Sequence, residues 1–416
     1  MRRRLWLAVC AAIVWIFGTA LAFAGSTEPP FKHGATLVEF FQFPKTVGDG
    51  PAKHYADPVF PGVQAALRLF DFAELRREGF DHIRLLIDVG PLLARDGAQL
   101  NAVMAQLHAV IAELHRHGLA VLVTLLPPTP GGEVAVPLLD GLRGPRFERY
   151  VTLSVRIAAE LAAVKSGVVA LEPMNEPQTE CRASAGPDWT AYQDILVTRI
   201  RRATPDLGLF LTGGCWSSID GIVLLDTPLL RDPRNFVSVH FYNPFIFTHQ
   251  TATWAMPFLA GVIGLPYPAA AGDADVTLAD TRTRFAAMNL PAQIRQSQFA
   301  EAEKAIRWYF AEEGKASTTE GWMDKLADWQ IREGVPSDRI VFTEFGAMKQ
   351  LTDGIETDRA SRARWLHDAA AAMERHGWGW TVYVLHDGPF SLYDDESDRR
   401  PDPLLLSALR LSPVTH

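Results

Sequence analysis

Several features that would define other protein classes are scarce or absent in this 416-residue chain. Three cysteines are too few for a scaffold held by disulfides, and the 31 glycines and 28 prolines form neither a collagen period nor a low-complexity tract. We find no internal repeat. The net charge of −8, from 48 acidic against 40 basic residues, argues against nucleic acid or an anionic membrane surface as a main partner. With 48% hydrophobic and 21% charged residues, the chain is typical of a globular protein with a large core, and not of a multi-span membrane protein.

The N-terminal segment has the three parts of an export signal. Residues 2–4 are arginines, an uncharged apolar run covers 5–23, and Ala-Phe-Ala at 22–24 fits the small-x-small cleavage rule. The alternative is an uncleaved membrane anchor, because the run approaches the roughly 20 residues that a membrane span needs. We expect a signal peptide over 1–24, a secreted or periplasmic location, and no contact with a membrane after cleavage.

Short apolar runs and amphipathic stretches alternate along the rest of the chain. Apolar residues recur at helical spacing in 100–117, 147–164, 189–203 and 359–376, with Asp188 as an N-cap of the third stretch. This alternation favours an α/β fold, and eight runs favour a (β/α)8 TIM barrel. The alternative is an open doubly wound sheet, whose glycine-rich phosphate loop is missing here. The eight predicted strands are 34–41, 82–89, 119–126, 168–174, 207–213, 236–242, 339–344 and 380–385.

One connection is much longer than an ordinary barrel crossover. The stretch 243–335 separates the sixth run from the seventh and contains a helix-like segment over 292–313. Insertions after a barrel strand lie on the C-terminal face, where barrel active sites are built. We expect this insertion to form a wall or lid over the catalytic face, the alternative being a stabilising flap. No linker divides 25–416, which we interpret as one catalytic domain.

Two glutamates follow predicted strands and suggest chemistry. Glu176 lies in Pro-Met-Asn-Glu-Pro after the fourth strand, and Glu344 lies in Phe-Thr-Glu-Phe-Gly at the end of the seventh. Either one alone would be read as a structural carboxylate, but both would face one another across the barrel mouth. Two facing carboxyl groups suit cleavage of a glycosidic bond, about 5 Å apart in retaining enzymes and about 6.5–9.5 Å in inverting ones.

These motifs together resemble glycoside hydrolase family 5, the cellulase-like retaining β-glycosidases, over about residues 34–393. The resemblance implies that Glu176 is the acid/base and Glu344 the nucleophile. It further implies that Asn175 contacts the sugar 2-hydroxyl and that Arg84 supports the nucleophile. On the His-x-Tyr motif of the sixth strand, Tyr242 would bond the nucleophile and His240 would line the subsite near the acid/base.

The chain departs from the family pattern at two places. Leucines and prolines occupy 125–128, where the family has a histidine, and 383–387, near the end of the eighth strand, lack the tryptophan that the family has there. Tyr383 or His386 would partly replace that aromatic floor, and Trp216 offers another surface for a sugar ring.

The two cysteines of the mature chain follow neighbouring strands. Cys181 comes after the fourth strand and Cys215 after the fifth, both on the catalytic face. This placement favours a disulfide between them over two buried free thiols.

These features together predict a secreted retaining β-glycosidase that hydrolyses a β-glucan or related polysaccharide. Alternatives are a relative acting on mannan, xylan, β-1,3-glucan or an exopolysaccharide, and an inactive barrel that only binds polysaccharide. No metal-binding sequence motif stands out, so we expect neither a metal nor another cofactor.

Overall fold

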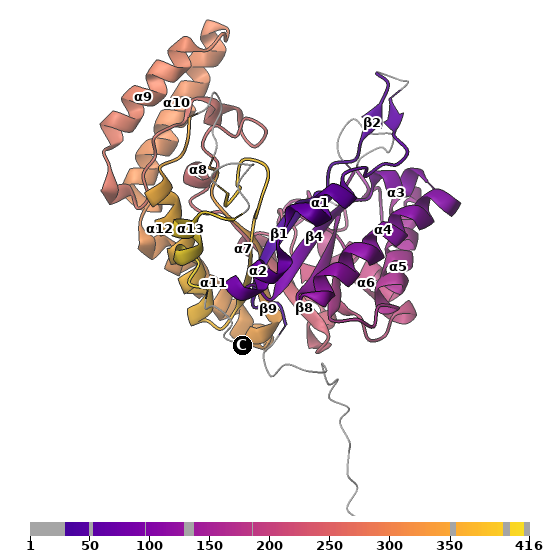
Figure 1. Ribbon diagram of the computed structural model, residues 1–416. Coiled ribbons are helices and arrows are strands. Elements are labelled where there is room, and N and C mark those ends of the chain that lie inside the picture. The colour runs from indigo at the N-terminus through magenta and orange to yellow at the C-terminus, as the bar shows by residue number, and fades with distance from the viewer. Residues whose placement is uncertain are drawn as a thin grey trace, which may run out of the picture.

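The chain folds around one closed barrel of eight parallel strands (Figure 1). The computed structural model describes residues 30–49, 53–95, 97–128, 137–184, 186–349, 355–393 and 400–411. The predicted export signal, 1–24, lies outside these ranges. Around the barrel the strands follow the order β1, β10, β9, β8, β7, β6, β5, β4 and then β1 again. This closure confirms the predicted (β/α)8 barrel and excludes the open sheet.

Every barrel strand coincides with one of the eight predicted runs. The strands are β1 (His33–Phe41), β4 (His82–Asp88), β5 (Ala120–Leu126), β6 (Val169–Glu172), β7 (Gly208–Thr212), β8 (Asn235–Phe241), β9 (Ile340–Phe345) and β10 (Gly379–Val382). Two short strands, β2 (Thr46–Val47) and β3 (His54–Tyr55), pair antiparallel in the connection that follows β1. The fourth and eighth runs end earlier as strands than predicted, because the chain turns there into the loops of the barrel mouth.

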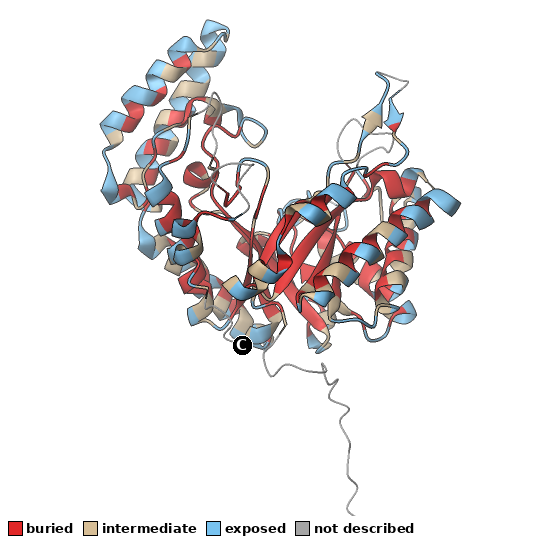
Figure 2. Ribbon diagram, viewed as in Figure 1, coloured by how far each residue is buried: buried red, intermediate tan, exposed pale blue. Residues whose placement is uncertain are grey.

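Helices surround the barrel with their apolar faces toward the strands and their polar faces toward solvent (Figure 2). The four helices predicted from periodicity are all present, and Asp188 caps one of them by accepting a hydrogen bond from the backbone N–H of Ala191 at 3.4 Å. Within the described residues, no helix has the length and apolar composition needed to cross a bilayer. The helices outside the long connection are α1 (Val63–Leu69), α2 (Phe72–Glu78), α3 (Gly90–Ala94), α4 (Gly97–Arg116), α5 (Pro145–Ala162), α6 (Trp189–Ala203), α7 (Ile219–Ile222), η2 (Pro228–Arg231), α12 (Arg359–Arg375) and α13 (Pro403–Ala408).

The connection from β8 to β9 contains the predicted insertion. It comprises α8 (Phe245–Thr248), η3 (Pro257–Gly261), η4 (Ala269–Ala271), α9 (Ala274–Ala287), α10 (Ala292–Trp308), the π-helical turn η5 (Tyr309–Glu313), α11 (Ala316–Glu333) and η6 (Ser337–Arg339). The predicted helix over 292–313 is thus confirmed as α10 and η5. Because α11 packs against α12 and α7 in the outer ring, the part added to the barrel is 242–313. Figure 1 shows α9 and α10 side by side, projecting from the same end of the barrel as β2.

Side chains that point into the barrel change from apolar to polar toward its mouth. Phe31 packs edge-on against Phe210 and Phe236, with ring centroids 5.3 and 5.6 Å apart, and closes the N-terminal end. Alternate residues of a strand point to the same face, so the next side chain that points into the barrel is Thr212 after Phe210 on β7, and Ser238 after Phe236 on β8. This polar layer, fully buried beneath the mouth, forms the floor on which the candidate site is built.

Candidate active site

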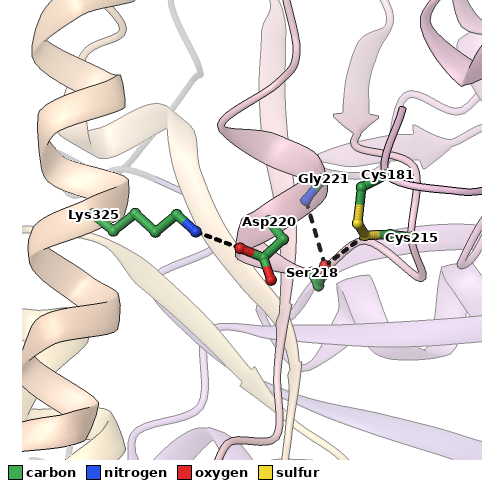
Figure 3. Close-up of a disulfide and its surroundings, with 6 residues drawn as sticks. All are labelled: Cys181, Cys215, Ser218, Asp220, Gly221 and Lys325. Carbon is green, nitrogen blue, oxygen red and sulfur yellow. Dashed lines mark hydrogen bonds and ion pairs between the residues drawn. A yellow bond between two sulfur atoms is a disulfide. The ribbon is translucent and has the colours of Figure 1, made fainter. Parts of the chain in front are cut away.

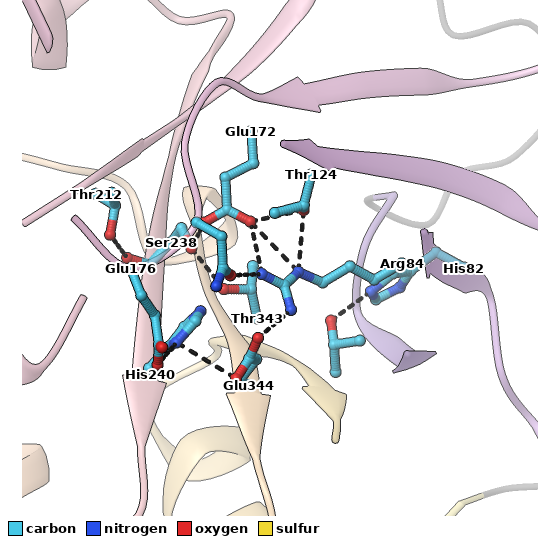
Figure 4. Close-up of polar contacts among 12 residues, drawn as sticks. His82, Arg84, Thr124, Glu172, Glu176, Thr212, Ser238, His240, Thr343 and Glu344 are labelled. Atoms are coloured by element: carbon cyan, nitrogen blue, oxygen red, sulfur yellow. Dashed lines mark hydrogen bonds and ion pairs between the residues drawn. The ribbon is translucent and has the colours of Figure 1, made fainter. Parts of the chain in front are cut away.

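The centre of the polar network is the buried guanidinium of Arg84 on β4 (Figure 4). Its Nη1 donates to Glu344 Oε1 at 2.5 Å, and its Nη2 donates to Glu172 Oε2 at 3.0 Å and to Asn175 Oδ1 at 2.6 Å. Its Nε donates to Thr124 Oγ1 at 3.0 Å. Burial alone would lower the pKa of Arg84, but the two carboxylates outweigh it and raise the pKa above its usual value. Arg84 therefore remains a cation that joins strands β4, β6 and β9.

Glu344, on β9, has both carboxylate oxygens engaged. Arg84 donates to Oε1, and the Tyr242 hydroxyl donates to Oε2 at 2.8 Å. His240 Nδ1 lies 3.5 Å from Oε2. Burial pushes the pKa of Glu344 up, but the charges of His240 and Arg84 and the hydrogen bonds from Arg84 and Tyr242 bring it below its usual value. The carboxylate is thus held ionised and oriented.

A register shift between β8 and β9 aligns the groups around Glu344. Val239 pairs with Phe342, whereas His240 pairs with Glu344, so Thr343 is passed over. An irregularity of this kind changes the face to which the following side chains point. It brings the imidazole of His240 and the carboxyl of Glu344 to the same side of the mouth, which strict alternation after Val341 and Thr343 would not do.

Glu176 lies in the loop that follows β6, and its surroundings shift its pKa in the direction opposite to that of Glu344. Its backbone takes a positive φ of 41°, a conformation that non-glycine residues rarely adopt and that frequently marks functional positions. One oxygen lies 2.9 Å from His240 Nδ1. Burial, and then the charge of Glu344, raise the pKa of Glu176, although the hydrogen bond to His240 acts against them. Its side chain retains 31% of its accessible surface, so this raised-pKa carboxyl faces the open mouth.

The two carboxyl groups are close to one another. One oxygen of Glu176, one oxygen of Glu344 and a ring nitrogen of His240 all lie within 4.8 Å of one another. Three such groups are also a ligand set for a metal ion. However, Arg84 and Tyr242 already donate to both oxygens of Glu344, and a guanidinium 2.5 Å from one of them opposes a second cation. The donor set therefore fits a carboxyl pair better than a metal centre.

Sequence reasoning missed Glu172, whose side chain is fully buried on β6. Besides Arg84, it accepts hydrogen bonds from Thr124 Oγ1 at 2.7 Å and from Ser238 Oγ at 2.5 Å. The available signal was a glutamate inside an otherwise apolar run, since a buried charge requires a partner. That partner is Arg84, from a strand far away in the sequence.

The other predicted substrate-binding residues lie in different surroundings. Tyr383 follows β10, and its backbone N–H donates to O of Phe345, the residue after Glu344, at 2.9 Å. Burial and then the charge of Glu344 raise the pKa of Tyr383. His386 is buried, and its Nδ1 lies 2.9 Å from Glu39 Oε1 at the end of β1. Burial raises the pKa of Glu39, against the effect of His386. Trp216 is 55% exposed in the loop that follows β7.

The insertion adds an aromatic cluster beside Tyr242. The ring of His249 stacks on Phe245 at 3.9 Å and lies edge-on to Tyr242 at 5.0 Å and to Trp254 at 5.4 Å. Burial lowers the pKa of His249 to about 3, so this imidazole is neutral. These contacts place the beginning of the insertion against the site.

A disulfide joins Cys181 and Cys215 on the catalytic face (Figure 3). The two Cα atoms are 4.4 Å apart, and the bond connects the loops that follow β6 and β7. Figure 3 also shows Lys325 of α11 paired with Asp220, at the start of α7 after the second cysteine loop. The loop that carries Glu176 is therefore tied to its neighbour around the mouth.

Fold and site together define a parallel (β/α)8 barrel with two facing carboxyl groups at its C-terminal mouth, an arrangement used by barrel glycosidases. The chain belongs to the cellulase family, glycosyl hydrolase family 5, whose sequence profile matches residues 71–388.

Two similar proteins of known name are also cellulose-related enzymes, a cellodextrinase and an endoglucanase. Cellodextrinase A of Ruminococcus flavefaciens is 29% identical over 196 residues, 46% of this chain and 56% of that protein. Endoglucanase 3 of Fibrobacter succinogenes is 23% identical over 192 residues, 46% of this chain and 26% of that protein. The matches thus span about half or less of the relatives' length. The crystal structure of Thermotoga maritima Cel5A with mannotriose has a similar fold, with a TM-score of 0.60, 17% identity, and coverage of 91% of this chain and 97% of that one.

Proposed function

We propose that this protein is a retaining β-glycosidase that hydrolyses a β-glucan, with Glu344 as the nucleophile and Glu176 as the acid/base. The observation that carries the proposal is the pair of carboxyl groups whose environments shift their pKa values in opposite directions, with oxygens within 4.8 Å of one another. A protonated acid and an ionised nucleophile at this separation are what a double displacement requires.

In the first step, Glu176 donates its proton to the glycosidic oxygen while Glu344 attacks the anomeric carbon. Arg84 and Tyr242 hold the attacking carboxylate in place. The bond from the anomeric carbon to the leaving oxygen breaks, and a glycosyl ester forms on Glu344. Because Asn175 Oδ1 already accepts from Arg84, its amide nitrogen is left to donate to the sugar 2-hydroxyl.

In the second step, Glu176 acts as a base. Ester formation removes the negative charge of Glu344, which is one of the causes of the raised pKa of Glu176. The pKa of Glu176 therefore falls when its proton has been used. It then accepts a proton from water, which attacks the anomeric carbon and releases Glu344 with overall retention of configuration.

The substrate class rests on the names of the relatives, a cellodextrinase and an endoglucanase, which favour a β-glucan. The location rests on the sequence of residues 1–24, which predicts export, and the Cys181–Cys215 disulfide is consistent with an oxidising compartment. An inactive, purely binding barrel has no need of two carboxyl groups with opposed pKa shifts.

The direct test is the release of reducing sugar from β-1,4-glucan, β-1,3-glucan, mannan and xylan by the chain from Gly25 onward. We expect release from a β-glucan, and a loss of at least about 10³-fold in Glu344→Gln and in Glu176→Gln. Glu301→Gln, a change of an exposed carboxyl on α10, is the matched control and should keep full activity. If the protein released no reducing sugar from all four polysaccharides, the proposal would be refuted.

Two further measurements separate the roles of the carboxyls. Proton NMR of the first product should show the β anomer, whereas an initial α anomer would mean inversion. With azide and dinitrophenyl β-cellobioside, Glu176→Ala should form the β-glycosyl azide and Glu344→Ala the α-glycosyl azide. The reverse pattern would exchange the two assignments.

A further inference from the structure

Glu172 of β6 lies on one edge of the Arg84 guanidinium, and Glu344 of β9 lies on another (Figure 4). Glu172 Oε2 accepts from Arg84 Nη2 at 3.0 Å and from Arg84 Nε at 3.3 Å, whereas Glu344 Oε1 accepts from Nη1. The side chains of Arg84 and Glu172 have no accessible surface, and that of Glu344 retains 7%. Because water is excluded from these groups, each carboxylate acts on the shared cation with little screening.

The contacts of Nη2 limit the pairing between Arg84 and Glu344 to one hydrogen bond. A terminal guanidinium nitrogen carries two hydrogens, and those of Nη2 are taken by Glu172 Oε2 at 3.0 Å and Asn175 Oδ1 at 2.6 Å. The forked two-bond geometry of arginine and carboxylate is therefore not available to Glu344. Its other oxygen accepts from the Tyr242 hydroxyl at 2.8 Å instead.

The carboxylate of Glu172 is itself held in a fixed orientation. Thr124 Oγ1 donates to its Oε2 at 2.7 Å, and Ser238 Oγ donates to its Oε1 at 2.5 Å. Against burial, which lowers the pKa of Arg84, the charge of Glu172 and then that of Glu344 raise it. Glu172 therefore supplies a counter-charge to Arg84 that does not depend on the state of Glu344.

The proposed reaction makes this counter-charge important at one stage. When Glu344 bonds to the anomeric carbon, its carboxylate becomes an ester and loses its negative charge. Of the two carboxylates bonded to Arg84, only Glu172 then remains charged. A buried cation that loses its compensating charge is costly, so removal of the charge of Glu172 would disfavour the ester and favour the free carboxylate of Glu344.

We propose that Glu172 is a positioning residue for the proposed nucleophile, because it keeps Arg84 compensated while Glu344 loses its charge in the ester and regains it on hydrolysis. This inference rests on the proposed glycosidase function. Glu172 acts through Arg84 and not on the substrate. Without its charge, Arg84 binds the ionised Glu344 more strongly, so the ester forms more slowly and is hydrolysed faster.

The first test measures the ionisation of Glu344 without a substrate. In protein labelled with carbon-13 at the glutamate carboxyls, the signal of Glu344 is the one that Glu344→Gln lacks. Glu172→Gln preserves the shape of the side chain and removes its charge, so the titration midpoint of this signal should fall by about one pH unit. Glu172→Asp preserves the charge and alters the shape, so the midpoint should fall by less. The other groups that face Glu344 are unchanged in both variants: Arg84 on β4, Glu176 after β6, His240 and Tyr242 at the end of β8, and Tyr383 after β10.

The second test follows the formation and the loss of the ester. The dinitrophenyl β-glycoside of 2-fluorocellobiose transfers its sugar to Glu344: the bond from the carboxylate oxygen to the anomeric carbon forms, and dinitrophenolate leaves. Water then attacks that carbon, gives a proton to Glu176 and releases Glu344 as a carboxylate. Glu172→Gln should form the ester roughly threefold more slowly and hydrolyse it roughly threefold faster. A merely loosened site would slow both steps.

Glu374→Gln is the matched control, because it removes a partly buried carboxylate at the other end of the barrel. Glu374 on α12 accepts from Trp380 Nε1 at 3.3 Å, and Trp380 pairs with His33 at the beginning of β1. This variant should change neither the midpoint nor the two rates. All variants are compared at a temperature where circular dichroism shows a folded protein.

A midpoint that rises in Glu172→Gln would overturn the proposal, because a displaced guanidinium stabilises the Glu344 carboxylate less and Glu172 would then only hold Arg84 in place. An unmoved midpoint would also overturn it and leave Glu172 a role in stability alone. If Glu172→Gln does not fold, the direction of the smaller shift in Glu172→Asp decides the result in the same way. If the parent forms no ester but the midpoint still falls, the proposed glycosidase function fails and the electrostatic role of Glu172 stands.

Discussion

The replacement Tyr242→Phe isolates one hydrogen bond that controls the ionisation of Glu344. The hydroxyl donates to Glu344 Oε2 at 2.8 Å, and burial keeps it protonated by raising the pKa of Tyr242 well above its usual value. A hydrogen bond to a charged group contributes about 1.5–3 kcal/mol, and one pKa unit corresponds to about 1.4 kcal/mol. Loss of the hydroxyl should therefore raise the pKa of Glu344 by about one to two units.

The direction in which the pH profile moves follows from the proposed role of Glu344 as the nucleophile. The nucleophile must be ionised, so the acidic limb of kcat/KM reports the lowered pKa of Glu344 in the free enzyme. In Tyr242→Phe this limb should move to higher pH by about one to two units. Because Glu176 and Glu344 titrate as a pair, the limb is a property of both, and the measured shift belongs to the pair.

The assay is the pH dependence of kcat/KM for dinitrophenyl β-cellobioside. This leaving group needs no protonation, so proton donation by Glu176 does not contribute to the rate, and a shift of the acidic limb reports the loss of the hydrogen bond to Glu344. Tyr309→Phe is the matched control, because it removes a buried hydroxyl that donates to Pro266 O in the insertion and touches neither carboxyl. A uniform loss of rate in Tyr242→Phe with an unmoved acidic limb would refute the assignment of this phenol to the ionisation of Glu344.

Three other outcomes are expected. Glu172→Gln should lower the free energy of unfolding in urea by about 3–5 kcal/mol, because Arg84 loses one of the two carboxylates that compensate its buried charge; an unchanged midpoint would contradict this. Replacing Cys181 and Cys215 by serine should cost about 4 kcal/mol in the same assay, since the bond closes a loop with a sequence separation of 34 residues, and the difference should vanish when both proteins are reduced. Asn175→Ala should lower kcat/KM on a glucoside roughly 100-fold but have much less effect on its 2-deoxy analogue, and equal losses would exclude the proposed hydroxyl contact.

The network around Arg84 connects the stability of the barrel with its proposed chemistry. The same guanidinium that orients Glu344 also neutralises Glu172, which is tied to β5 and β8 through Thr124 and Ser238. A buried ion pair contributes little net stability, but it becomes costly when one partner is lost. Removal of the Arg84 charge would therefore leave two buried carboxylates, those of Glu172 and Glu344, without their shared cation, and they would repel each other.

The predicted fold followed from local information in the sequence. Apolar runs buried on both faces, helical periodicity, and an N-cap at Asp188 are signals that span only a few residues, and each of these elements formed where it was expected. The positions of Glu176 and Glu344 after strands also indicated that both would face the mouth. Their place at the C-terminal ends of barrel strands is sufficient for that conclusion, whereas the side to which Glu344 points depends on the register shift between β8 and β9.

The contacts of Glu344 with Arg84 and Tyr242 were expected from the family resemblance, but other contacts between strands were not. Glu172 appeared as one more residue of an apolar run, and its role emerged only when the barrel brought its carboxylate to Arg84, which reaches it from β4 past the intervening strand β5. His386, expected as a possible sugar-binding residue, lies against Glu39 of β1.

The sequence by itself thus determined the eight strands, four of the outer helices and the order of the candidate residues, because these depend on local periodicity and on turns. The tertiary structure decided how those residues interact. The register shift at His240 and Glu344 set their distance, and burial together with charges from β4, β8 and β9 set the opposite pKa shifts of the two carboxyls. Distance and dielectric environment depend on side chains that meet only after the barrel has closed, so no pattern along the chain encodes them.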